Sequence, residues 1–153
     1  MQGILMFFLG IGAIIIIIAI AWLVFYFIGL WKMFKKCGKQ GWESIIPIYN
    51  TWILVEIAGL KNYWFIISLA PSLGSLITDN AFLSMIFSIV SLLANIGIIY
   101  NISKKFNKDT TWFVLSIFFS GITLPILGYS NSDSYHSEVE VAPNACFESI
   151  FKN

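Results

Sequence analysis

The sequence predicts an all-α integral membrane protein with four transmembrane helices and a re-entrant or interfacial helical hairpin. Apolar residues make up 58% of its 153 residues and charged residues only 11%, whereas soluble domains are nearer half apolar and a quarter charged. Residues 1–31 contain no charged side chain. A soluble fold of this length would struggle to hide so much apolar surface. A soluble enzyme and a nucleic-acid-binding protein are therefore excluded as first interpretations, and no nucleic-acid partner is expected.

The first expected span covers residues 4–31. A helix over this range reaches roughly 42 Å, against a hydrocarbon core of about 30 Å, so it crosses with tilt or protrudes. The apolar run is too long for a signal peptide and no basic segment precedes it, so cleavage is not expected. Residues 32–41 then form a basic loop, in which Gly38 and Gly41 interrupt the helix.

Residues 42–60 are apolar but interrupted by polar residues and a proline. Pro47 ends any helix that starts at residue 42, Asn50 is placed to cap a second short helix, and Gly59 is placed to end it. Each piece is about two turns long, too short to cross a bilayer. The segment is therefore predicted to be a re-entrant or interfacial hairpin that does not span.

Three further apolar runs are expected to cross the bilayer, over residues 63–78, 81–102 and 111–127. The first of them is the shortest, and Pro71 is expected to kink it. These spans and the hairpin make up a membrane helical domain of residues 1–129. The remaining residues, 130–153, are polar and acidic and are predicted to form a mobile C-terminal tail.

The basic residues predict the orientation, because short lysine-rich loops are retained on the cytoplasmic side of the cell (inner) membrane. All nine are lysines, and seven of them lie in two stretches next to apolar runs. If both stretches are cytoplasmic, the N-terminus and the tail lie outside, and residues 42–60 return without crossing. The same lysines are expected to contact lipid headgroups; they are Lys32, Lys35, Lys36, Lys39, Lys104, Lys105 and Lys108.

Tryptophans near these lysines are expected to act as interface anchors, because their rings prefer the headgroup level. They are Trp31, Trp42, Trp64 and Trp112. The predicted orientation also separates the two cysteines, Cys37 and Cys146, on opposite sides of the bilayer, so they cannot pair.

Hydroxylated residues recur at intervals of three and four along the later spans, which aligns them on one face of each helix. Such faces let helices approach closely and form interhelical hydrogen bonds. A packing seam is the favoured interpretation, with a polar path through the bundle and exposure to lipid as alternatives. The residues are Ser68, Ser72, Ser75, Ser84, Ser88, Ser91, Ser116, Ser120 and Thr123.

Four residues are candidate functional polar or turn positions: Glu56, Asn50, Pro47 and Asn95. Glu56 is the most informative, because a carboxylate inside a bilayer is costly unless it is paired or protonated. It either faces headgroups on an interfacial helix, forms a structural bond inside the bundle, or takes part in substrate or proton binding. If the segment enters the bilayer, its partner is expected to be Lys61 or Lys39, a serine or asparagine, or water. Asn95 is expected to hold helices together.

No catalytic, cofactor or metal site is predicted, and the protein is not expected to be an enzyme. One histidine and two cysteines cannot make a structural zinc site unaided. His136 lies alone in the tail without a fixed triad geometry. The lysines lie at the interface, where no apolar pocket lowers the pKa of an amine for nucleophilic catalysis.

Several short motifs are distinctive: a lysine and glycine loop followed by Gly41-Trp42, then Ile46-Pro47-Ile48-Tyr49-Asn50, Glu56-Ile57-Ala58-Gly59, Lys104-Lys105-Phe106-Asn107-Lys108 and Pro125-Ile126-Leu127-Gly128-Tyr129. Together they resemble a prokaryotic family of small multi-span membrane domains of unknown function. Members of that family also occur ahead of the catalytic domain of signal peptidase I-like proteins. Asn107 stands where the family usually has glycine. The resemblance implies that this chain is a membrane module. It does not imply that this chain cleaves signal peptides.

The leading functional hypothesis is a non-enzymatic integral membrane interaction or anchoring module. Its expected partners are membrane lipids and either another protein or further copies of the chain. One alternative is a small channel or transporter that uses the broken hairpin and Glu56, since broken helices often bind substrates or ions. Another is an accessory subunit of protein export or signal-peptide processing, which rests on the family resemblance alone.

Overall fold

The structure is a computed structural model that describes residues 2–141, and this part of the chain contains helices and no strand. Cys146 and the tail beyond residue 141 lie outside the described residues. The elements, in chain order, are α1 (Gln2–Lys36), the 3₁₀ helix η1 (Gly41–Ser44), α2 (Pro47–Ile57), α3 (Tyr63–Ser68), α4 (Ala70–Ile77), α5 (Ala81–Lys105) and α6 (Thr110–Tyr129).

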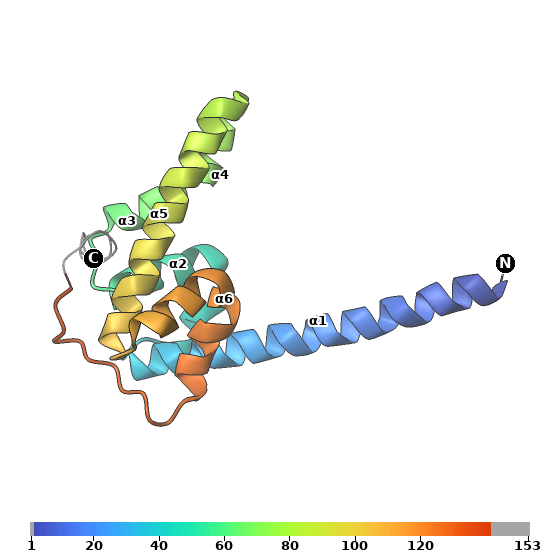
Figure 1. The fold of residues 1–153 in the computed structure, drawn as a ribbon, viewed down its shortest axis with the longest axis horizontal. Coiled ribbons are helices and arrows are strands. Elements are labelled where there is room, and N and C mark those ends of the chain that lie inside the picture. The colour runs from blue at the N-terminus through green and yellow to red at the C-terminus, as the bar shows by residue number, and fades with distance from the viewer. Residues whose placement is uncertain (1, 142–153) are drawn as a thin grey trace.

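Helix α1 is longer than the expected span over residues 4–31 and includes the first lysines of the basic loop. Its 35 residues correspond to roughly 52 Å. Lysines in the last turn favour a helix end, because their charge complements the helix dipole. The chain leaves the helix through Gly38, whose φ of 74° suits a residue without a side chain. Most of α1 projects from the core as a single rod (Figure 1).

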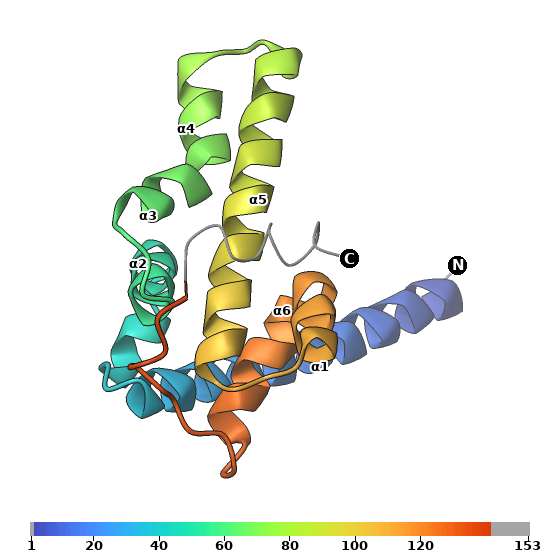
Figure 2. The same ribbon diagram turned by 60° about the vertical axis from the view of Figure 1, so that its left-hand side comes forward.

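Residues 42–60 form η1 and α2, and the turn between them precedes Pro47 instead of following it. Pro47 lies in the first turn of α2, where its missing N–H costs nothing. The expected cap at Asn50 is therefore wrong, because this residue lies inside α2. Gly59 does follow the helix end, with a φ of 73°. The segment packs against the C-terminal ends of α1 and α5 (Figure 2).

Helices α3 and α4 replace the single expected run over residues 63–78 and pack antiparallel to α5. The break falls at Leu69, next to Pro71, where a kink is expected. Across the pair, Ser91 Oγ donates to the Ser68 carbonyl at 2.7 Å. At the far turn, Asn80 Oδ1 accepts the N–H groups of residues 82 and 83 and so caps α5.

Helix α6 turns back on itself, so the apolar run expected over residues 111–127 consists of two helical arms. Phe119 at the bend has a non-helical backbone, with φ −126° and ψ 39°. A straight helix of 20 residues would separate its ends by roughly 30 Å. Instead, Lys108 Nζ and Asp133 Oδ1, from residues that flank the two ends, lie 2.8 Å apart.

The neighbours of each arm confirm the reversal. The first arm runs antiparallel to α5, with Phe113 packed on Tyr100 and Ile117 nearer the start of α5. The second arm runs parallel to α1, since Gly121 faces Trp22 and its later residues reach the end of α1. Because the lysine-bearing ends of α1 and α5 lie together, α6 leaves that end and returns to it.

The core lies at this lysine-bearing end of the molecule, where the ends of α1, α2, α5 and α6 meet. Its largest fully buried apolar side chains are Phe34, Leu30, Met33, Ile57, Ile102 and Leu127. Away from it, α1 and the α4–α5 tip diverge and expose their apolar side chains (Figure 1).

Three helices in the described residues are long and apolar enough to cross a membrane, and they begin at Gly10 within α1, at Ala81 and at Thr110. Helices of this length that expose apolar side chains are suited to a lipid environment and not to water. The chain is a membrane protein.

Candidate functional site

The basic end of the molecule gathers the predicted headgroup-contacting lysines around the core. Lys32 and Lys35 are exposed, Lys36, Lys39, Lys104 and Lys108 are half-buried, and Lys105 is buried. Five of them lie over aromatic rings, with Nζ 4.6–5.9 Å from the ring centroid. Such cation–π contacts hold a charged amine against an otherwise apolar surface. The result is a positively charged platform braced by aromatic side chains.

Glu56 lies on the surface of this platform and forms an ion pair with Lys39. Its side chain is 52% exposed, so the pair sits at the rim of the bundle and outside the core. Pro47 is exposed at the start of α2, at the opposite end of the helix from Glu56.

Asn50, by contrast, has a structural environment in the buried interior. Its Nδ2 donates to the Ser44 carbonyl at 3.2 Å and thereby ties α2 to η1. Its Oδ1 is buried and accepts no hydrogen bond in the described residues. Glu43 is also buried, and its carboxylate accepts the N–H of Gln40 at 3.0 Å. Both residues therefore stabilise the conformation of the loop between α1 and α2.

Lys36 caps the second arm of α6. Its Nζ donates to the carbonyls of Leu127, at 2.7 Å, and of Ser130, which have no partner inside the helix. At the start of the first arm, Lys108 pairs with Asp133. Burial acts to raise the pKa of Asp133, but hydrogen bonds from Lys108 and Ser130 and the nearby positive charges outweigh it and lower that pKa. Two lysines thus fasten both ends of α6 to one platform.

Residues 133–141, called the strap here, cross the basic end. The strap is held by Tyr135, whose hydroxyl donates to the Ile57 carbonyl at 2.9 Å, and by the His136 N–H, which donates to the Lys105 carbonyl at 2.9 Å. The sequence predicts that the tail lies across the membrane from the basic loops. In the structure, Asp133 and His136 contact the second basic stretch directly. The reason is the reversal of α6.

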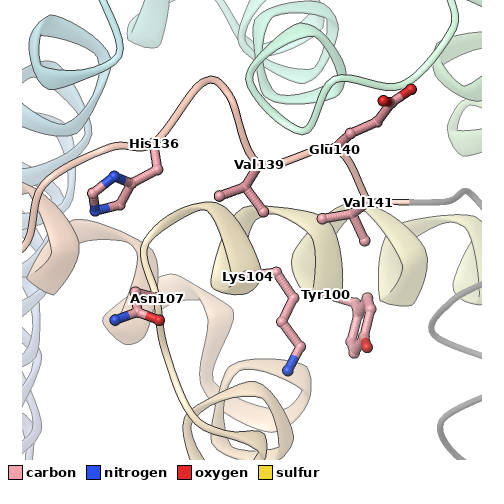
Figure 3. Close-up of a pocket in the computed structure, with 7 residues that line it drawn as sticks. All are labelled: Tyr100, Lys104, Asn107, His136, Val139, Glu140 and Val141. Atoms are coloured by element: carbon pink, nitrogen blue, oxygen red, sulfur yellow. The ribbon is translucent and has the colours of Figure 1, made fainter.

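Two pockets lie along the strap. The first has a volume of about 520 Å³ and lies between the strap and the last turns of α5. Figure 3 shows His136 and Asn107 at one end of it and Tyr100 at the other, with Glu140 pointing away from Lys104. The second, of about 750 Å³, lies between the strap and the link from α2 to α3, and Lys105 lines it.

Cys37 lies beside the strap residue Tyr135 and against the core. Burial raises the pKa of the Cys37 thiol to about 12, although Lys105, Lys36 and Lys39 act to lower it. Burial likewise raises the pKa of Tyr135 to about 12. Both groups are neutral at physiological pH, so Cys37 lacks the thiolate that nucleophilic chemistry requires. No cluster of three potential metal ligands occurs in the described residues.

The predicted hydroxyl faces divide into buried and open parts. Ser91, Ser116 and Thr123 are buried. Ser116 and Thr123 donate to carbonyls four residues earlier, at 2.8 and 3.1 Å, while Ser91 reaches Ser68 on the neighbouring helix. Ser72 and Ser88 are exposed, Ser84 is half-buried, and the side chain of Ser75 lies outside the described part of the structure.

The open part of the hydroxyl face forms a polar groove, about 360 Å³ in volume, between α5 and the bend of α6. Ser88, Asn95 and Ser120 supply its polar groups, and leucine and isoleucine side chains complete its walls. Asn95 is exposed, and its Nδ2 donates to the Ser91 carbonyl at 2.8 Å. Its Oδ1 accepts no hydrogen bond from residues 2–141. The groove therefore presents an exposed amide oxygen on the surface of α5.

The four predicted tryptophan anchors have different surroundings. Trp31 packs over Gly41, and Trp64 packs over Gly97. Trp112 lies beneath the Lys108 ammonium. Trp42 is exposed and stacks on Tyr49 with ring centroids 5.7 Å apart. Two of the four, Trp31 under Lys35 and Trp112 under Lys108, thus also brace the platform.

Sequence reasoning missed the close crossing of α1 and the second arm of α6. A Cβ on Gly29 would lie 2.3 Å from the Cβ of Pro125, so the helices meet only where glycine occurs. The motif Pro125-Ile126-Leu127-Gly128-Tyr129 lies at this crossing. The sequence alone does not show that the motif packs on Gly29 of α1. Asp133 and Tyr135 were missed for the same reason, because their contacts are distant in sequence.

Comparison with known proteins gives one family match. The model of a family of unknown function, DUF5684, matches residues 42–138, which include η1, all helices from α2 to α6 and most of the strap. No curated protein and no solved structure matches the chain.

Proposed function

This chain belongs to the DUF5684 family of unknown function, and on that premise we propose that it is a non-enzymatic interaction module of the cell membrane. In this proposal the polar groove on α5 is the interaction surface, and its occupant is the same groove on a second copy of the chain. The observation that carries the proposal is the exposed Asn95 amide, which lies beside Ser88 and Ser120 in a groove walled by leucine and isoleucine side chains.

The physical argument starts from the cost of polar groups in lipid. An amide in the hydrocarbon region is stabilised when it finds a hydrogen-bonding partner on another helix, and each such bond contributes about 0.6–2 kcal/mol. Asparagine carries both a donor and an acceptor. Two copies of Asn95 related by a two-fold axis can therefore satisfy each other, as an isologous interface requires.

The proposed membrane arrangement has three crossings. Helix α1, the α3–α4 pair and α5 cross, with the lysine platform on the cytoplasmic side and the N-terminus outside. Helix α6 enters from the platform and returns as a re-entrant hairpin, and α2 lies at the interface. The position of the bend supports this, since Trp22 beside Gly121 is about 14 residues, or roughly 20 Å, along α1 from Lys36. The strap then shares the cytoplasmic side with both basic loops.

The channel or transporter alternative gains no comparable support. Its key residue, Glu56, pairs with Lys39 at the rim of the platform, away from the polar groove. A role in protein export or signal-peptide processing rests on resemblance alone and is not proposed.

Oxidative cross-linking between single cysteines tests the proposed function. Asn95→Cys, in a chain with Cys37→Ala and Cys146→Ala, is expected to form a disulfide-linked dimer in native membranes. The matched control is Val90→Cys, which lies on an exposed part of α5 outside the groove. Equal dimer yields from the two variants, or no dimer from either, would contradict the proposal. Asn95→Leu should also weaken self-association in detergent, measured by energy transfer between labelled copies.

A further inference from the structure

Lys105 is a buried residue whose charge the described part of the chain does not neutralise. The residue is only 6% exposed. Within residues 2–141 no carboxylate lies within 4.0 Å of its Nζ, and no group accepts a hydrogen bond from it. Its only aromatic contact in this range is the Tyr135 ring, 5.7 Å from Nζ to centroid. The amine itself is not fully buried and has no anionic partner among the described residues, so it is available to bind an anion from outside this part of the chain.

Lys105 faces a cleft with room for such a group. The cleft is the 750 Å³ pocket between residues 58–61 and the strap. Gly59 forms its wall beside the amine, and a Cβ on Gly59 would lie 2.7 Å from Lys105 Nζ. The absence of a side chain at Gly59 therefore leaves the amine accessible. Lys61, which is exposed and has no carboxylate partner in the described residues, adds a second positive charge.

We propose that this cleft binds a phosphate group, with Lys105 and Lys61 as the cationic contacts and the strap as its outer wall. The strap also brings Glu138 and Glu140 to the cleft, and Glu138 is engaged by His136 Nδ1 at 3.1 Å. These carboxylates repel a doubly charged anion more strongly than a singly charged one. The expected ligand is therefore a phosphodiester with one negative charge.

A phosphate group can come from a lipid headgroup or from solution. The lipid source rests on the proposed membrane arrangement, in which the end of α5 lies at the headgroup level. Binding by Lys105 itself does not depend on that arrangement or on self-association. The lipid and inorganic phosphate can be added separately, so the two sources of the phosphate group can be distinguished experimentally.

Thermal unfolding of the full-length protein in detergent provides the test, because a ligand that binds the folded state raises its stability as concentration increases. Phosphatidylglycerol and phosphatidylcholine are titrated in parallel, and inorganic phosphate is titrated alone. We expect saturable stabilisation by phosphatidylglycerol. Lys105→Gln should weaken the apparent affinity by roughly tenfold, as expected for loss of a charged hydrogen bond.

Two further variants make the test decisive. Lys61→Gln changes an exposed side chain, so it keeps the fold and should also weaken binding. Lys32→Gln removes an exposed lysine elsewhere on the platform and should leave binding unchanged. Stabilisation by inorganic phosphate alone, dependent on Lys105, would support the site and identify a soluble source. No response to either ligand, or an unchanged response in both cleft variants, would overturn the proposal whatever the result of the cross-linking experiment.

Discussion

Gly128 packs against the backbone of Gly29 so closely that a Cβ on Gly128 would lie 1.9 Å from the Gly29 carbonyl oxygen. This contact joins the second arm of α6 to α1 where Lys36 caps the arm. The crossing fixes the direction in which α6 returns, and through it the position of the strap.

Substitution of Gly128 by alanine should therefore destabilise the protein. The added methyl group must push α1 and α6 apart, and overpacking of this kind costs about 1–3 kcal/mol. The free energy of unfolding is measured in mixed micelles, with a denaturing detergent as the denaturant. Gly12→Ala is the matched control, because nothing lies within 4 Å of the position of its Cβ. Equal losses in the two variants would show that helix crossing is not the cause.

The reversal of α6 predicts the sidedness of engineered cysteines. In a background with Cys37→Ala and Cys146→Ala, an impermeant maleimide should label Asp79→Cys, at the far turn, in intact cells. Asn131→Cys, just after α6, should react only after the membrane is permeabilised. Both positions are exposed, so access to the reagent decides the result. Labelling of Asn131→Cys in intact cells would restore the straight crossing predicted from the sequence.

The Lys108–Asp133 pair should make the strap sensitive to acid. The pKa of Asp133 is lower in the folded protein than in the unfolded chain. Its stabilising effect is therefore fully present above the usual aspartate pKa and is lost as pH falls through the lowered value. Hydrogen exchange of the strap amides should rise over that range in the wild type. Asp133→Asn should show faster exchange already at neutral pH, and an unchanged rate would exclude a role for the pair.

Cys37 should alkylate slowly in the folded protein at pH 8. With its pKa raised to about 12 by burial, the thiolate is scarce, and the rate should be lower on the order of a hundredfold than that of an exposed thiol. The comparison is Gln40→Cys in a chain lacking Cys37, because residue 40 is exposed in the same loop. Denaturation should make the two rates similar. A fast reaction at Cys37 in the native state would contradict its placement.

Local signals explain what the sequence could predict. The helical class, the lysine-bearing end and the break near Pro71 follow from periodicity, charge and proline geometry, all of which act within a few residues. The Lys39–Glu56 ion pair agrees with one of the partners expected for Glu56. The family match agrees with the resemblance to a family of unknown function.

The remaining features depend on distant contacts. Residues 42–60 contain the proline and glycines that a re-entrant hairpin needs, yet α6 is the segment that turns back. The Ser120-Gly121 pair that follows Phe119 is a local signal for a kink, but it does not by itself predict a full reversal. The reversal follows from contacts with α1 at Gly29 and with Lys108 through Asp133. Propensity cannot reveal such tertiary effects.

The doubled-back α6 also has a mechanical consequence for the surrounding lipid. If its two arms enter only the cytoplasmic leaflet, that leaflet must accommodate more protein cross-section than the opposite one. The molecule is then a wedge, broad beneath the lysines and narrow at the far turn. A wedge of this shape is accommodated with least strain where the membrane bulges toward the cytoplasm, so local curvature would govern where the protein collects.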